Sequence, residues 1–102
     1  MAEVERFEFS GPVWRYPGAD GWHFVSVPPD VSASIADIGT GIRRGFGSVR
    51  VAATIGATSW RTSLFPDSKS ETYLLPVKKA VRSAENLGAG DEIWARLEIV
   101  DL

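Results

Sequence analysis

Two segments of this chain, 48–55 and 92–99, alternate apolar and more polar side chains, and this alternation constrains the fold more than any other sequence feature. The apolar positions are Val49, Val51, Ala53 and Ile55 in the first segment, and Ile93, Ala95, Leu97 and Ile99 in the second. A period of two is typical of a β-strand that buries one face and leaves the other in water. The sequence therefore predicts two half-buried strands as the centre of the fold.

Further strands and two short helices are predicted from shorter patterns. The expected strands cover residues 4–9, 13–16, 22–27, 59–65 and 72–75, separated by turns rich in Gly, Pro, Ser and Asp. One helix is expected over 31–38, after Asp30 as its N-cap, and a second over 76–86 with Pro76 as its first residue. A turn at Gly90–Asp91 leads into the last strand.

This order of elements predicts a mainly β protein. We expect a small closed or pseudo-closed β-barrel of the cradle-loop type, with five to seven strands and two short helices. In cradle-loop barrels a strand, a helix that begins with proline, a Gly-Asp turn and another strand follow one another as they do here. The 102 residues suit one domain, so residues 1–102 are expected to form a single β-barrel domain.

Composition excludes several classes of site. The chain has no cysteine, which excludes a disulfide framework, a thiolate zinc site and a cysteine nucleophile. The net charge is −2 and the isoelectric point is near 5.3, which argues against general affinity for nucleic acid. The first residues are acidic and no apolar run approaches the roughly 18 residues of a membrane span. We therefore expect a cytoplasmic protein with no membrane segment.

Four stretches of the sequence resemble one known family: Gly45–Val49, Trp60–Pro66, Tyr73–Lys78 and Gly90–Asp91. They are similar to the prokaryotic domain-of-unknown-function family numbered nineteen hundred and five, a small β-barrel domain. With a further likeness at 22–28, the resemblance covers nearly the whole chain. It implies a barrel fold and no particular activity, because the family has no established activity and no catalytic residues to carry over.

The chain departs from the family pattern in one loop and is shorter than some relatives. The segment between Asp67 and Tyr73 lacks the glycines of the pattern, so its conformation is less constrained by the resemblance. Longer relatives resemble fusions to a second domain, of the kind named for association with an outer-membrane porin. A chain of this length is expected to lack that domain.

The strongest candidate site combines cationic, hydroxyl and aromatic side chains. Six residues form the predicted ligand-binding site: Trp60, Arg61, Ser63, Tyr73, Lys78 and Arg82. The guanidinium, ammonium and hydroxyl groups would hold a small anionic or polar ligand, near a helix start, between the apolar walls of Trp60 and Tyr73. The simpler interpretation is that Lys78, Lys79 and Arg82 are the solvated face of an amphipathic helix.

Two other binding roles stay open. A dimeric nucleic-acid-binding regulator would use Arg43, Arg44 and Arg50 on phosphates, although the acidic isoelectric point counts against it. A protein-interaction module or homodimer would use some of the four tryptophans, with Trp94 placed between Glu92 and Arg96 on the polar face of the last strand.

The sequence favours a binding module over an enzyme. His23 is the one histidine and could be a general base, and a hydrolase or isomerase using His23 or Asp67 is the third hypothesis. Ser59 and Ser63 lie outside any Gly-x-Ser-x-Gly motif, which weakens a catalytic serine. No metal site and no cofactor are expected, since ligand-type residues do not occur at recognisable spacing.

Overall fold

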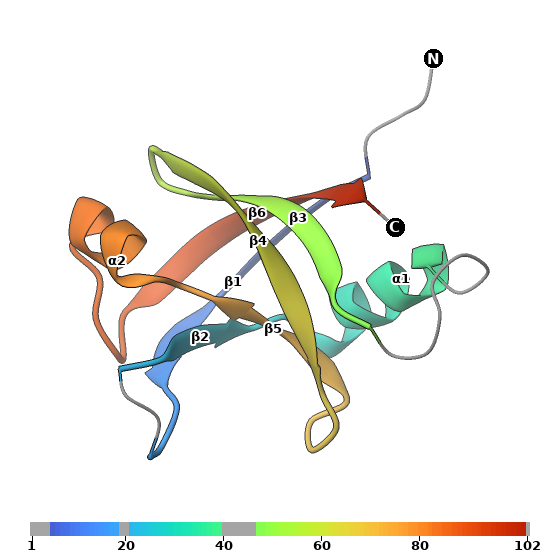
Figure 1. Cartoon of the computed structure of the whole chain (residues 1–102), viewed down its shortest axis with the longest axis horizontal. Coiled ribbons are helices and arrows are strands. Elements are labelled where there is room, and N and C mark those ends of the chain that lie inside the picture. Colours follow the sequence, from blue (N-terminus) through green and yellow to red (C-terminus); the bar gives the residue numbers. More distant parts are fainter. Residues whose placement is uncertain (1–4, 19–20, 40–46, 102) are drawn as a thin grey trace.

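The computed structural model describes residues 5–18, 21–39 and 47–101, and over these ranges six strands close into an antiparallel barrel (Figure 1). The strands are β1 (Arg6–Arg15), β2 (His23–Ser26), β3 (Val49–Ile55), β4 (Thr58–Asp67), β5 (Thr72–Pro76) and β6 (Glu92–Asp101), with helices α1 (Pro29–Gly39) and α2 (Lys79–Glu85). Around the barrel the strand order is β1-β2-β5-β4-β3-β6. The predicted mainly β barrel with two short helices is confirmed.

The inner faces of the strands form the core, as the alternation predicted. In β3 the side chains of Val49, Val51, Ala53 and Ile55 are buried, and in β6 those of Ile93, Ala95 and Leu97 are buried. The intervening residues of β6, from Glu92 to Arg96, are exposed on the outer face. Burying an aliphatic side chain of this kind contributes about 1.5–3 kcal/mol to folding. Alternation along the sequence thus becomes the inside and outside of the barrel.

β4 changes its partner strand along its length. Residues 58–64 pair with β3, whereas Phe65–Asp67 pair with β5. β5 then continues beside β2, where Leu75 pairs with Val25, so β4 and β5 diverge above their shared hairpin (Figure 1). β1 behaves in the same way, because 6–12 pair with β6 and 13–15 pair with β2. Along β4, the change of partner leaves residues 58–64 unpaired with β5.

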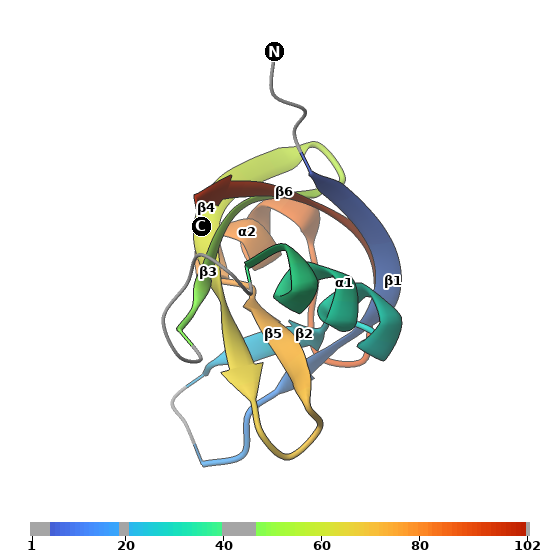
Figure 2. The same ribbon diagram turned by 90° about the vertical axis from the view of Figure 1, so that its right-hand side faces the viewer.

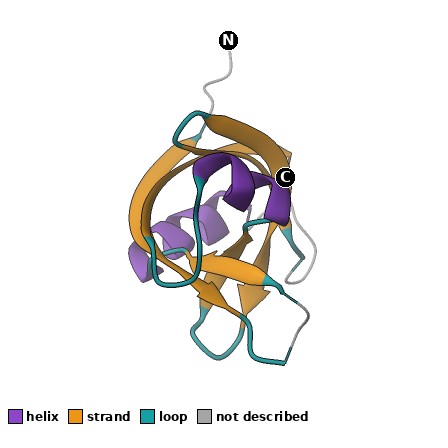
Figure 3. Cartoon of the chain, turned by 90° about the vertical axis from the view of Figure 1, so that its left-hand side faces the viewer, coloured by secondary structure: helices purple, strands orange, loops and turns teal. Residues whose placement is uncertain are grey.

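The helices lie at opposite ends of the barrel. Figure 2 shows α1 across one end, where Ile35 is buried and Ser32 is tied to two strands. The Ser32 hydroxyl donates to the Val27 carbonyl at 3.1 Å and accepts from the Tyr73 amide at 3.0 Å. Figure 3 shows α2 across the other end, where Val81 packs into the core.

The second helix begins later than predicted. Pro76 is the last residue of β5 and pairs with Phe24, while Lys78 is the N-cap of α2. The next amide, that of Val77, donates to the His23 carbonyl at 2.9 Å, so the backbone is still bonded to β2 after the proline. The sequence pattern could not distinguish a proline that begins a helix from one that ends a strand.

Glu85 links α2 to the β3–β4 turn through hydrogen bonds. Its Oε2 accepts hydrogen bonds from the Thr58 hydroxyl at 2.6 Å and from the Ala57 amide at 3.3 Å. Gly56, in the same turn, has φ of 60°, and a Cβ added there would overlap the Glu85 carboxylate. The turn therefore requires glycine for both its backbone conformation and this contact.

Replacing Gly56 with alanine tests the contact between this turn and Glu85. We expect Gly56→Ala to lower the free energy of unfolding by about 2 kcal/mol, from left-handed backbone strain and loss of the Glu85 hydrogen bonds. Gly88→Ala is the matched control, because Gly88 has no positive φ and a Cβ there meets nothing within 4 Å. Urea unfolding of both variants measures the difference, and equal stabilities would contradict the role given to Gly56 and Glu85.

Candidate functional site

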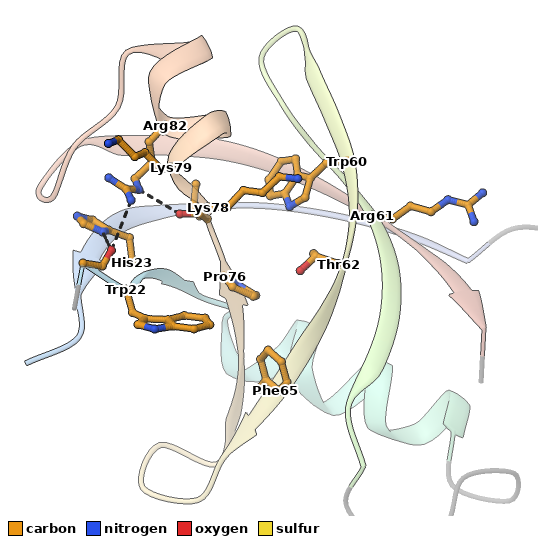
Figure 4. A pocket seen from close by; sticks show the side chains of 12 residues that line it. Trp22, His23, Trp60, Arg61, Thr62, Phe65, Pro76, Lys78, Lys79 and Arg82 are labelled. Carbon is orange, nitrogen blue, oxygen red and sulfur yellow. Dashed lines mark hydrogen bonds between the residues drawn. The ribbon is translucent and has the colours of Figure 1, made fainter. Parts of the chain in front are cut away.

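A pocket of about 400 Å³ lies in the gap between β4 and β5, beside the start of α2 (Figure 4). Its lining residues come from the start of β2 and the two residues before it, from β4, from the end of β5 with the link that follows, and from α2: Gly21, Trp22, His23, Trp60, Arg61, Thr62, Phe65, Pro76, Val77, Lys78, Lys79 and Arg82. This volume lies within the range of small-molecule sites. The divergence of the two strands therefore creates a cavity that a small ligand can enter.

Aromatic rings flank the pocket on both sides of the gap. Trp60 is half-buried and packs against the core, whereas Trp22 and Phe65 are 54% and 44% exposed. Trp22 is supported from behind by Phe24, with the ring centroids 5.9 Å apart and the planes inclined by 17°. Exposed aromatic faces supply flat apolar area for stacking a ligand.

The charged groups around the pocket are cationic. Lys78, Lys79, Arg82 and Arg61 line it, and among its described lining residues none is Asp or Glu. Between described residues the ion pairs are Arg6–Glu98 and Arg96–Glu8, which lie on β1 and β6 and involve none of the pocket cations. The pocket is therefore locally positive although the chain carries a net charge of −2.

The cations differ in where they point. Figure 4 shows the Lys78 side chain extending toward Trp60, across the pocket. The Arg61 guanidinium points away from the other lining side chains, so this residue borders the pocket without directing its charge into it (Figure 4). Lys78 is thus the cation best placed to meet a ligand.

Arg82 holds the segment before β2 against the start of α2. Its Nε donates to the Val77 carbonyl at 3.1 Å and its Nη2 to the Gly21 carbonyl at 3.4 Å. The Gly21 oxygen lies 2.6 Å from His23 Nδ1, and since a carbonyl oxygen can only accept, the proton is on Nδ1. In the neutral ring Nε2 is left as an acceptor. These bonds fix one wall of the pocket.

The structure brings together four of the six predicted site residues. Trp60, Arg61, Lys78 and Arg82 line the pocket, whereas Ser63 and Tyr73 do not. Tyr73 is 8% exposed and belongs to the core cluster, because its side of β5 faces into the barrel. Ser63 pairs with Arg50 of β3, on the face opposite to Trp60 and Thr62. Ligand binding by these residues stays a prediction.

Several pocket residues were not among the predicted ones. Thr62 shares the inner face of β4 with Trp60, and the alternation along this strand could have indicated it. Lys79 adjoins Lys78 in the sequence and was assigned to the solvated helix face. Trp22 lies just before β2 and Phe65 lies in β4, and no local pattern indicates that they border one cavity.

The other predicted surfaces are only partly described. Trp94 is 58% exposed on the outer face of β6, as its position in the alternation predicted. A homodimer through this residue stays a prediction. Arg50 is exposed on β3, but Arg43 and Arg44 lie outside the described residues. The nucleic-acid hypothesis also stays a prediction.

Replacing Arg82 tests its role in fixing the pocket wall. We expect Arg82→Gln to lower the free energy of unfolding by about 1–3 kcal/mol, since the Val77 and Gly21 carbonyls lose their charged donor. Amide hydrogen exchange at 21–23 should also become faster. Arg61→Gln removes the same charge from a guanidinium that points away, and it should leave both measurements unchanged. Equal effects of the two substitutions would contradict the bridging role.

Comparison with known proteins identifies the family and adds no activity. Residues 9–97 match the family described as Domain of unknown function (DUF1905), and the chain therefore belongs to it. The resemblance inferred from the sequence motifs is confirmed. Comparison with curated proteins gives no match. Over the described ranges, no three His, Asp or Glu side chains gather as a metal site, and neither helix is long and apolar enough to cross a bilayer.

Proposed function

We propose that this member of the family is a non-enzymatic binding module whose β4–β5 pocket holds a small organic anion with a flat apolar body. One observation carries the proposal: cationic side chains and aromatic rings line the same cavity, and none of its described lining residues is acidic. Positive charge selects for an anion, and the rings favour a ligand with an apolar surface over a free inorganic ion.

Two kinds of cation would act on the ligand. Lys78 extends across the pocket and supplies an ammonium group with three donors (Figure 4). Arg82 already donates two of its five N–H groups to backbone carbonyls, which leaves three for an anion. Because those two bonds hold the guanidinium in place, less conformational entropy is lost when a ligand binds to it.

The aromatic residues would contact the body of the ligand. Trp60 stands on the inner side of the gap, and Trp22 and Phe65 flank its outer side. A planar group between them would bury apolar area on both faces. Stacking contacts of this kind are worth about 0.5–1.5 kcal/mol beyond the area that they bury.

A binding role accounts for the pocket better than catalysis does. A nucleophile and its base must lie within hydrogen-bond distance of each other. In the described structure the His23 ring is hydrogen-bonded through Nδ1 to the Gly21 carbonyl, so the histidine acts as a structural donor. The groups that converge on the cavity supply charge and stacking surface.

Titration with simple anions tests the proposal. Benzoate and indole-3-acetate combine a carboxylate with a ring, whereas acetate and inorganic phosphate lack the ring. We expect saturable shifts of the Trp22 and Trp60 indole N–H signals in proton–nitrogen NMR spectra, larger with the aromatic acids. Lys78→Gln should weaken binding roughly tenfold, since a charge-assisted hydrogen bond is worth about 1.5–3 kcal/mol.

The matched control is Arg61→Gln, which removes the same unit of charge from a side chain that points away from the pocket. We expect it to weaken binding by less than a factor of two to three. No saturable shift with any of the anions, or equal losses in the two variants, would contradict the proposed site.

A further inference from the structure

We infer that the natural ligand of this pocket is the C-terminal segment of an extended peptide. The peptide adds a strand to β4 in the β4–β5 gap and places its terminal carboxylate among Lys78, Lys79 and Arg82. The inference rests on the proposed function, because it names the ligand class of the same site. Four features of the gap lead to it: an open strand edge, the direction of that strand, the cations at one end and the rings along the sides.

The open edge belongs to the upper part of β4. Over 58–64 this strand pairs with β3 on one side, and its pairing with β5 on the other side begins only at Phe65. Successive residues of an antiparallel strand direct their N–H and C=O groups alternately to the two sides. About half of the peptide groups between Trp60 and Leu64 therefore face the gap. Such groups bind water or another strand.

The end of β5, on the opposite side of the gap, is not paired with these groups. Leu75 and Pro76 of β5 pair with Val25 and Phe24 of β2, and Pro76 has no N–H to donate. An incoming strand would therefore pair with β4, in the manner of peptides that add to exposed sheet edges.

The direction of β4 places the carboxyl end of such a peptide beside the cations. β4 begins at Thr58, which is bonded to Glu85 of α2, and ends at Asp67 in the β4–β5 hairpin. Every strand pair of the described barrel is antiparallel. A peptide antiparallel to β4 runs from the hairpin toward α2, so its carboxylate ends near Lys78. A parallel peptide would bring its amino group to the same cations.

The rings are arranged to contact alternate side chains of an extended ligand. Trp60 and Thr62 face the gap from the inner surface of β4, and Trp22 and Phe65 border it from the outer surface (Figure 4). Successive side chains of a strand point to opposite faces. At about 3.4 Å per residue, the edge between Trp60 and Leu64 accommodates about four or five peptide residues.

Hexapeptides with matched chemical changes test the inference. The probe is an equimolar hexapeptide library randomised at its last four positions, from which the tightest binder is resynthesised in four forms. These are the free acid, the C-terminal amide, and two acids that are N-methylated at alternate backbone positions. We expect at least a tenfold loss of affinity for the amide. Only one N-methylated form should lose binding, because alternate N–H groups face β4.

Backbone NMR signals locate the bound peptide. With the free acid we expect the amides between Trp60 and Leu64 to shift and their hydrogen exchange to slow. Equal binding of acid and amide, or of both N-methylated forms and the parent, overturns the inference. Binding of benzoate or indole-3-acetate that Lys78→Gln weakens, without any peptide binding, overturns it too and leaves the proposed function standing. If neither anions nor peptides bind, both proposals fail.

Discussion

β4 exchanges its partner strand between Leu64 and Phe65, and the candidate site depends on this exchange. A strand paired with β5 along its whole length would close the gap and leave no cavity. Because β5 instead follows β2, the barrel closes with an opening in its wall, bordered by side chains of both its inner and outer surfaces. One exchange of partners thus supplies a cavity, a strand edge and a set of flanking rings.

α2 turns this opening into a cationic pocket. The helix is held at its end by Glu85, which accepts from Ala57 and Thr58, and at its middle by Arg82, which donates to the carbonyls of Val77 and Gly21. Both anchors are polar contacts to backbone or hydroxyl groups, and Val81 adds the apolar contact to the core. Lys78 and Lys79 are consequently presented at a fixed edge of the gap.

The elements with regular alternation could be predicted from the sequence, and the partner exchange could not. β3 and β6 have one apolar face each, so their strands and buried residues follow directly from the pattern. The Ser10–Pro12 segment suggested a break, yet β1 continues through it and changes partner there, from β6 at Pro12 to β2 at Val13. A proline cannot donate a backbone hydrogen bond to a neighbouring strand, but its presence in the sequence does not show whether the strand ends there.

The candidate site was predicted in part for similar reasons. The cations and Trp60 were identified from their chemistry alone, but the cavity that unites them arises from distant strand pairings. Tyr73 was predicted as an apolar wall of the site, but all four side chains of 72–75 are buried in the structure, and this strand has no polar outer face. In the loop that lacks the family glycines, Glu71 adopts the left-handed conformation with φ of 58°.

Amide hydrogen exchange along β4 in the free protein tests the central claim most directly. We expect alternating protection between Trp60 and Leu64, with slow exchange for amides bonded to β3 and fast exchange for those that face the gap. From Phe65 to Asp67, where β4 pairs with β5 instead of β3, the amides that face β5 should exchange slowly, and Pro66 has no amide proton. Uniform slow exchange over Trp60–Leu64 would show that the edge is closed, and would contradict this account of the pocket.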